Sequence, residues 1–122
     1  MKVRVLLAVS SIIFSSHALA DYSSHQFHYM EMGLEQCKQI ATDAAAKIGF
    51  SNSQSQDFPY GGDGRQYGVV YGTNKEGYSF QYTCEPVKGF GYLIVNGARV
   101  DIKNKIRDEL GSEIKKASSK AK

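Results

Sequence analysis

Residues 67–84 read YGVVYGTNKEGYSFQYTC, and this stretch decides the fold. In its second half, large apolar side chains alternate with small polar ones, which is the pattern of a strand with one buried face. The apolar set consists of Tyr78, Phe80, Tyr82 and Cys84. The intervening Asn-Lys-Glu-Gly, residues 74–77, has the composition of a turn. The stretch therefore predicts a β-hairpin in which residues 67–73 and 78–84 pair across a short loop.

The segment upstream of the hairpin has the period of a helix. From Leu34 to Ile48, apolar residues recur at every third or fourth position, and Gly49 follows where a helix end is expected. Cys37 belongs to this apolar stripe. We expect residues 34–48 to form the best-defined helix of the chain.

Further elements are indicated by weaker patterns. Residues 25–32 and 90–96 have the composition of strands, and residues 100–116 have the spacing of an amphipathic helix that Gly111 weakens. The order β-α-β-β-β-α, with hairpins rather than crossovers, predicts an α+β domain. We expect a small antiparallel β-sheet with two helices packed on one face.

Two segments lack a regular pattern. Residues 51–66 are rich in Ser, Gln and Gly and contain Pro59, which predicts a long loop. A long loop in so small a domain is often functional. The C-terminal tail, residues 118–122, is expected to fray.

The N-terminus has the pattern of a secretory signal peptide. Lys2 and Arg4 precede an apolar run, and the small residues of Ala-Leu-Ala end at Ala20 as in a cleavage site. We expect residues 1–20 to be removed on export through the inner membrane. Residues 21–122 would then act in the periplasm as one domain.

Cys37 and Cys84 are the only cysteines. In an oxidising compartment such a pair forms a disulfide, and their wide separation does not match a metal motif. We expect a Cys37–Cys84 bond that pins the helix to the hairpin. The chain-entropy model gives it a stabilisation of about 4 kcal/mol.

Composition argues against several classes of function. With Lys2 and Arg4 removed, 13 basic residues face 12 acidic ones, and a net charge of +1 is too small for strong nucleic-acid binding. His25 and His28 point to opposite faces of a strand and so do not form a metal site. No segment of the mature chain approaches the roughly 20 apolar residues that a membrane span needs. We expect no cofactor, no metal and no membrane insertion.

A catalytic constellation is also missing from the sequence. The carboxylate pairs Asp108 with Glu109 and Glu31 with Glu35 fit solvated helix ends. Cysteines held in a disulfide do not act as nucleophiles. We therefore expect a protein that is not an enzyme.

Tyrosine beside glycine is the most distinctive feature of the composition, with eight tyrosines and twelve glycines. Protein-recognition surfaces use tyrosine because it supplies contact area and a hydroxyl at low entropic cost. Tyr92 follows Gly91 near a strand start, and Tyr60 follows Pro59 in the long loop, so both are expected at exposed edges. For the other tyrosines, packing on the sheet and recognition both remain open.

Charge divides the mature chain into two parts. Residues 21–98 contain eight acidic and five basic side chains, whereas residues 99–122 contain four acidic and eight basic ones. An acidic sheet half suits a cationic partner. The basic helix end is equally explained by favourable interaction with the helix dipole.

Several short runs carry a family resemblance. They are LEQCKQIA at residues 34–41, the Tyr-Gly-Gly of residues 60–62 and the Gly-Tyr of residues 91–92, together with the signal peptide. With these runs the chain resembles the periplasmic immunity proteins of type VI secretion, and more narrowly those paired with a C-terminal muramidase domain of a spike-type effector. The resemblance implies a dimeric inhibitor, without enzymatic activity, that binds the effector in its peptidoglycan-cleaving cleft and protects the producing cell and its siblings.

Five residues are our candidates for contact with such a cleft: Tyr92, Tyr60, Gln56, Glu31 and Phe90. Tyr92 offers a ring and a hydroxyl that can donate to a catalytic carboxylate. Phe90 lies between two glycines, which allows close approach to a groove. Tyr60 and Gln56 present polar groups from the long loop, and Glu31 can pair with a basic rim.

Two other classes of function remain open at this point. A periplasmic binding module for a cell-wall fragment or other small ligand would use the same tyrosine-rich surface. A small cell-wall hydrolase would use the carboxylates. Inhibition of a muramidase on cell-wall substrate would favour the inhibitor, whereas fragment release by the protein alone would favour the hydrolase.

Overall fold

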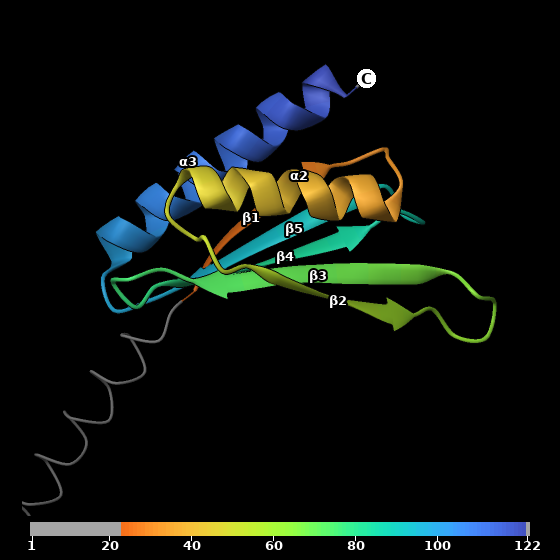
Figure 1. The fold of residues 1–122 in the computed structure, drawn as a ribbon, viewed down its shortest axis with the longest axis horizontal. Coiled ribbons are helices and arrows are strands. Elements are labelled where there is room, and N and C mark those ends of the chain that lie inside the picture. Colours follow the sequence, from red (N-terminus) through yellow and green to blue (C-terminus); the bar gives the residue numbers. More distant parts are fainter. Residues whose placement is uncertain (1–22, 122) are drawn as a thin grey trace, which may run out of the picture.

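One antiparallel sheet and two helices make up the part of the chain that the computed structural model describes, residues 23–121. In chain order the elements are β1 (Ser24–Tyr29), α2 (Leu34–Lys47), β2 (Gln54–Pro59), β3 (Gln66–Thr73), β4 (Ser79–Glu85), β5 (Phe90–Asn96) and α3 (Val100–Lys120). The five strands lie in the order β1-β5-β4-β3-β2. Figure 1 shows α2 and α3 over the same face of the sheet. The predicted α+β class is confirmed.

The hairpin of β3 and β4 forms as predicted. Its strands pair antiparallel from Gly68, which lies opposite Cys84. In the turn, the side-chain Oδ1 of Asn74 accepts a hydrogen bond from the Tyr78 N–H at 2.9 Å. Gly77 adopts a φ of 87°, a conformation that favours glycine. The Asn-Lys-Glu-Gly sequence therefore closes the hairpin by ordinary turn chemistry.

A disulfide joins the first helix to the sheet. The sulfurs of Cys37 on α2 and Cys84 on β4 are 2.04 Å apart, which confirms the predicted pairing. On α2 the same stripe buries Ile40, Ala41 and Ala44 against the sheet. The helix and its inward face are thus as the three-and-four spacing predicted.

The hydrophobic core lies between the sheet and the two helices. Each strand places alternate side chains toward the helices, because successive side chains of a strand point to opposite faces. The fully buried large side chains of the sheet include Val70, Tyr82, Leu93 and Val95, and those of α3 include Leu110 and Ile114. The helix side of the sheet therefore carries nearly all of the packing that holds the fold together.

One glycine makes room for a buried ring in this core. A Cβ added to Gly91 on β5 would lie 2.0 Å from the hydroxyl oxygen of Tyr82 on the adjacent β4. Tyr82 is itself fully buried. The backbone of β5 can lie beside that ring only because residue 91 has no side chain.

The predicted loop over residues 51–66 was wrong, because residues 54–59 form the edge strand β2. Its Gln-Ser-Gln-Asp-Phe-Pro sequence lacks the β-branched residues and the alternation that mark strands. Tertiary contacts supply the order instead. All six residues pair with β3, and the Lys38 ammonium on α2 donates to both carboxylate oxygens of Asp57 at 2.8 and 3.0 Å.

Two element ends also differ from expectation. Strand β1 ends at Tyr29 rather than at residue 32, because the chain turns toward α2. Helix α3 continues to Lys120, so the tail does not fray within the described residues. Gly111 does not interrupt α3, since it is buried against Gln26 on β1.

Some predictions fall on the N-terminus. The signal peptide, residues 1–20, lies outside the described residues and stays a prediction. Within residues 23–121, neither helix is long and apolar enough to cross a membrane.

Candidate functional site

The face of the sheet that points away from the helices is the most distinctive surface of the protein. No element within residues 23–121 covers it, as Figure 1 shows. We call it the open face. It is formed by His25, Phe27, Tyr29, Gln54, Gln56, Phe58, Tyr67, Val69, Tyr71, Gln81, Thr83, Glu85, Phe90, Tyr92 and Ile94, which alternate with the buried residues and lie opposite one another in register.

Aromatic rings gather at one end of the open face. On β1 and β5, Phe27 stacks on Phe90 with ring centroids 5.2 Å apart and meets Tyr29 edge-on at 5.3 Å. At the other side of the sheet, Phe58 stacks on Tyr67 at 5.2 Å. Such ring pairs are worth about 0.5–1.5 kcal/mol each beyond the area they bury. We call this region, together with Tyr60 and Glu85, the aromatic end.

Tyr92 and Phe90 both lie on the open face, in β5. Tyr92 sits opposite Phe27 on β1 and Thr83 on β4, and its hydroxyl oxygen is 2.5 Å from Nδ1 of His25. The expectation that Tyr92 occupies an exposed edge was wrong. β5 is flanked by strands on both sides, so Tyr92 lies within the open face and is half-buried.

Gln56, Tyr60 and Glu31 lie on or beside the same face. Gln56 is exposed on β2 opposite Val69, in a strand rather than in the expected loop. Glu31 is exposed just after β1, with its Cγ 3.9 Å from the position of a Cβ on Gly89. The structure therefore brings the sequence candidates together around one surface, although they come from separate segments.

Tyr60 is engaged within the protein rather than free at an edge. It follows β2 and meets Tyr67 edge-on with ring centroids 5.7 Å apart. Its hydroxyl donates a hydrogen bond to the Glu85 carboxylate, and this bond is the main reason that the pKa of Tyr60 rises to about 12. The hydroxyl is thus committed to Glu85 in the free protein.

Sequence reasoning missed three residues of the open face. Phe27 and Tyr29 are its most exposed rings, with 49% and 84% of their surfaces accessible. Their alternation in a strand predicted that both rings point to the same side of the sheet. It did not predict that this side would be left uncovered by other elements. Glu85 lies at the end of β4 and is only 9% exposed, although a carboxylate at a strand end usually faces solvent.

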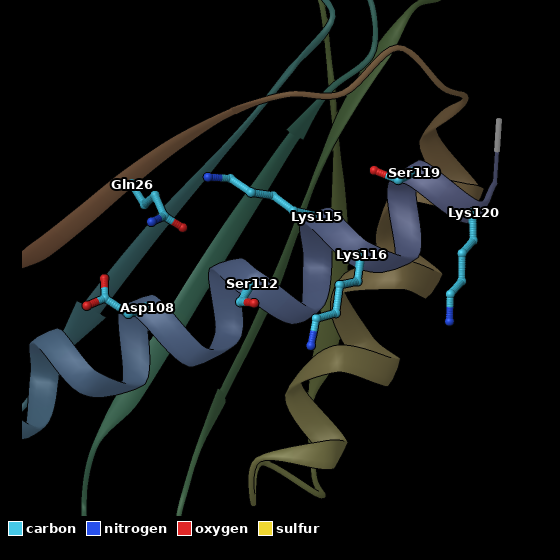
Figure 2. A pocket seen from close by; sticks show the side chains of 7 residues that line it. All are labelled: Gln26, Asp108, Ser112, Lys115, Lys116, Ser119 and Lys120. Atoms are coloured by element: carbon cyan, nitrogen blue, oxygen red, sulfur yellow. The ribbon is translucent and has the colours of Figure 1, made fainter.

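A second, cationic surface lies between α3 and β1. It is a groove of about 550 Å³ whose charged lining residues are Lys115, Lys116, Lys120 and the single acidic Asp108 of α3, with Gln26 of β1 on the other side. Figure 2 shows Lys115 extending toward Gln26, while Lys116 and Lys120 both extend away from Gln26. Positive charge from several lysines favours an anionic ligand in such a groove.

A buried hydrogen-bonded chain lies beneath this groove. His28 is 3% exposed, with Nε2 2.7 Å from Oε1 of Gln26 and Nδ1 3.0 Å from the hydroxyl of Tyr82. A neutral imidazole that donates from Nε2 and accepts at Nδ1 satisfies both partners. Burial, aided by the positive charge of Lys115, lowers the pKa of His28 to about 4. Burial also raises the pKa of Tyr82.

Neither surface has the ligands of a metal centre. No group of three or more His, Cys, Asp or Glu side chains within residues 23–121 is arranged to hold a metal ion. Comparison with known proteins adds no assignment either: no family model, no curated protein and no solved structure matches the chain. Function must therefore be inferred from the geometry of the two surfaces.

Proposed function

We propose that this protein is a periplasmic immunity protein that binds a cognate type VI secretion effector with peptidoglycan-degrading muramidase activity and occludes its active-site cleft. It protects the producing cell and its siblings. The open face is the observation that supports the proposal. An uncovered sheet surface with clustered tyrosine and phenylalanine rings has the composition of a protein-binding surface.

Occlusion requires no chemistry from the inhibitor. A muramidase holds the scissile bond between two carboxyl groups, one of which donates a proton to the leaving oxygen. A surface that fills the cleft and hydrogen-bonds to these groups excludes both the glycan and water. Tyr92 supplies the central ring, and its hydroxyl exchanges its contact with His25 for one with the enzyme. Phe90 supports that ring in β5, while Gln56 and Glu31 contact the rim.

The proposal includes a homodimer. Val87, between β4 and β5, and Val100, at the start of α3, are exposed apolar side chains outside the open face, so a second copy can cover them while the open face binds the effector. Symmetric pairing of two copies is the commonest way in which proteins bury such area.

Calorimetry with the cognate muramidase domain tests the binding site. We expect Tyr92→Ala to weaken binding by about 2 kcal/mol or more, because hot-spot aromatic residues contribute at least that much. Lys120→Ala, on α3 and away from the open face, is the matched control and should bind as the wild type does. Wild-type affinity in a folded Tyr92→Ala, Glu31→Ala double variant would exclude the proposed site.

A cell-wall cleavage assay tests occlusion separately from binding. Saturating inhibitor should stop the release of soluble fragments by the muramidase. Continued cleavage by the enzyme with inhibitor bound would show that the cleft remains open.

The cationic groove favours a second function, that of a periplasmic binding module for an anionic cell-wall fragment. Carboxylates of a peptidoglycan peptide suit Lys115, Lys116 and Lys120. Titration with purified muropeptides distinguishes the two. Saturable binding that Lys115→Ala abolishes, with no inhibition of muramidases, would favour the binding module.

A further inference from the structure

Glu85 is an unusual carboxylate, because it is nearly buried on a face that is otherwise uncovered. Only 9% of its surface is exposed at the end of β4. Its hydrogen-bond donor is the Tyr60 hydroxyl, a neutral group. Among residues 23–121, no lysine, arginine or histidine side chain forms an ion pair with it.

This arrangement leaves the charge of Glu85 incompletely compensated. Removing a carboxylate from water is costly, and buried carboxylates are ordinarily paired with a cation. One phenol hydroxyl replaces part of the lost hydration but supplies no positive charge. A cation beside the Glu85 carboxylate would therefore supply a charge partner that the described residues do not provide.

The neighbours of Glu85 are suited to a planar cation. Phe90 lies opposite Glu85 on β5. On the other side of β4, Tyr67 of β3 lies opposite Glu85, because both residues are one position beyond the paired Gly68 and Cys84. The Tyr67 ring therefore flanks Glu85 as well. Aromatic faces attract cations, and the attraction is strongest where water is excluded. A guanidinium can donate two parallel hydrogen bonds to a carboxylate and stack on a ring at the same time.

The other charges around the aromatic end do not supply this cation. Arg65, in the turn that also holds Tyr60, makes its ion pair with Asp63. Glu31 adds a second negative charge beside Gly89, in the connection from β4 to β5. Lys88 of that connection is exposed.

We propose that Glu85, with Tyr60 and the flanking rings of Phe90 and Tyr67, is the docking point for an arginine side chain of the protein partner. The assignment rests on the proposed function, in which the open face binds that partner. The arginine forms the ion pair that Glu85 lacks within the described residues of the free protein. Glu85 therefore favours a partner that carries an arginine on the rim of its cleft.

Glu85→Gln is the decisive variant. Glutamine keeps the shape of the side chain and its oxygen still accepts from Tyr60, but the negative charge is gone. We expect affinity for the cognate muramidase domain to fall at least tenfold. The thermal midpoint of the free variant should be equal to or above that of the wild type, because a nearly buried charge has been removed. A purely structural role for Glu85 predicts the reverse, a lower midpoint with unchanged affinity.

Two further variants test the specificity of the docking point. Tyr60→Phe keeps the ring and removes only the hydrogen bond to Glu85, so we expect it to fold and to weaken binding, although by less than Glu85→Gln, which removes the charge. Glu76→Gln removes an exposed charge from the turn between β3 and β4, outside the contacts proposed for the partner, and is the matched control for Glu85→Gln. An affinity loss of equal size in Glu76→Gln and Glu85→Gln would show a general effect of charge and overturn the specific docking point.

A probe without the muramidase separates this inference from the proposed function. Arginine methyl ester is titrated into the isotopically labelled protein, and resonances of Tyr60, Tyr67 and Phe90 are followed by NMR. We expect saturable shifts in the wild type that Glu85→Gln abolishes. Equal shifts in both proteins would overturn the docking point. Absence of muramidase binding by the wild type, with the arginine response intact, would instead reject the proposed function and leave the cation site standing.

Discussion

The burial of His28 makes the stability of this protein depend on pH. In the unfolded chain a histidine has a pKa near 6.5, whereas burial and Lys115 lower the pKa of His28 to about 4 in the folded protein. Above pH 6.5 the imidazole is neutral in both states and contributes no pH dependence. Between pH 6.5 and about 4 only the unfolded chain takes up the proton, so unfolding becomes more favourable as the pH falls. Below about pH 4 both states are protonated and the loss is complete.

The size of the effect is given by the two pKa values. The difference between 6.5 and about 4 corresponds to roughly 3 kcal/mol. This is a large share of the roughly 5–15 kcal/mol that stabilises a typical domain. His28 therefore sets a considerable part of the acid sensitivity of the fold.

Urea unfolding of the wild type and of His28→Gln between pH 7 and pH 4 measures this contribution. Glutamine does not titrate and can still hydrogen-bond to Gln26 and Tyr82. Titration of the carboxylates is common to both proteins and cancels in the comparison. We expect the wild type to lose about 3 kcal/mol more than the variant over this range. Parallel pH profiles, or an NMR titration of the His28 ring with a midpoint near 6.5, would refute the reasoning.

Other predictions concern the covalent state, the core and the assembly. Replacing Cys37 and Cys84 by serine should lower the free energy of unfolding by about 4 kcal/mol in chemical denaturation, and intact mass of the exported protein should show a chain that starts at Asp21 without free thiols. Gly91→Ala should cost about 1–3 kcal/mol because the added methyl overlaps Tyr82, whereas Gly62→Ala, with nothing within 4 Å, should leave the melting temperature nearly unchanged. Light scattering at micromolar concentration should give the mass of two chains, and the mass of one chain would contradict the proposed dimer.

The strongest local patterns predicted their elements correctly. The alternation from Tyr78 to Cys84 identified both the strand and its buried face, because period two and burial coincide in a one-sided sheet. The spacing of apolar residues around Cys37 identified α2 in the same way. Two cysteines leave only one possible pairing, so the contact between these two elements could also be predicted from the amino-acid sequence.

Features that depend on distant partners could not be predicted. Strand β2 has no strand composition of its own and is ordered by β3 and by the Lys38–Asp57 ion pair, which joins residues 19 positions apart. The burial of Glu85 depends on rings that lie on other strands. Tyr92 follows Gly91 near a strand start, which predicted an edge position, whereas strands flank β5 on both sides.

The one-sided core has a consequence for how this protein can change over evolutionary time. Side chains that pack against α2 and α3 maintain the fold, and those on the open face lie largely outside that packing. Substitutions at exposed positions of the open face are therefore expected to cost little stability, as surface changes usually do, and under the proposed function they would alter which surface is bound. Because the two sets of residues are separate, the open face can change in response to substitutions on a partner while the fold is kept. A family built on this scaffold would keep its helix-side residues and diversify its open face, so that relatives with the same fold would recognise different targets.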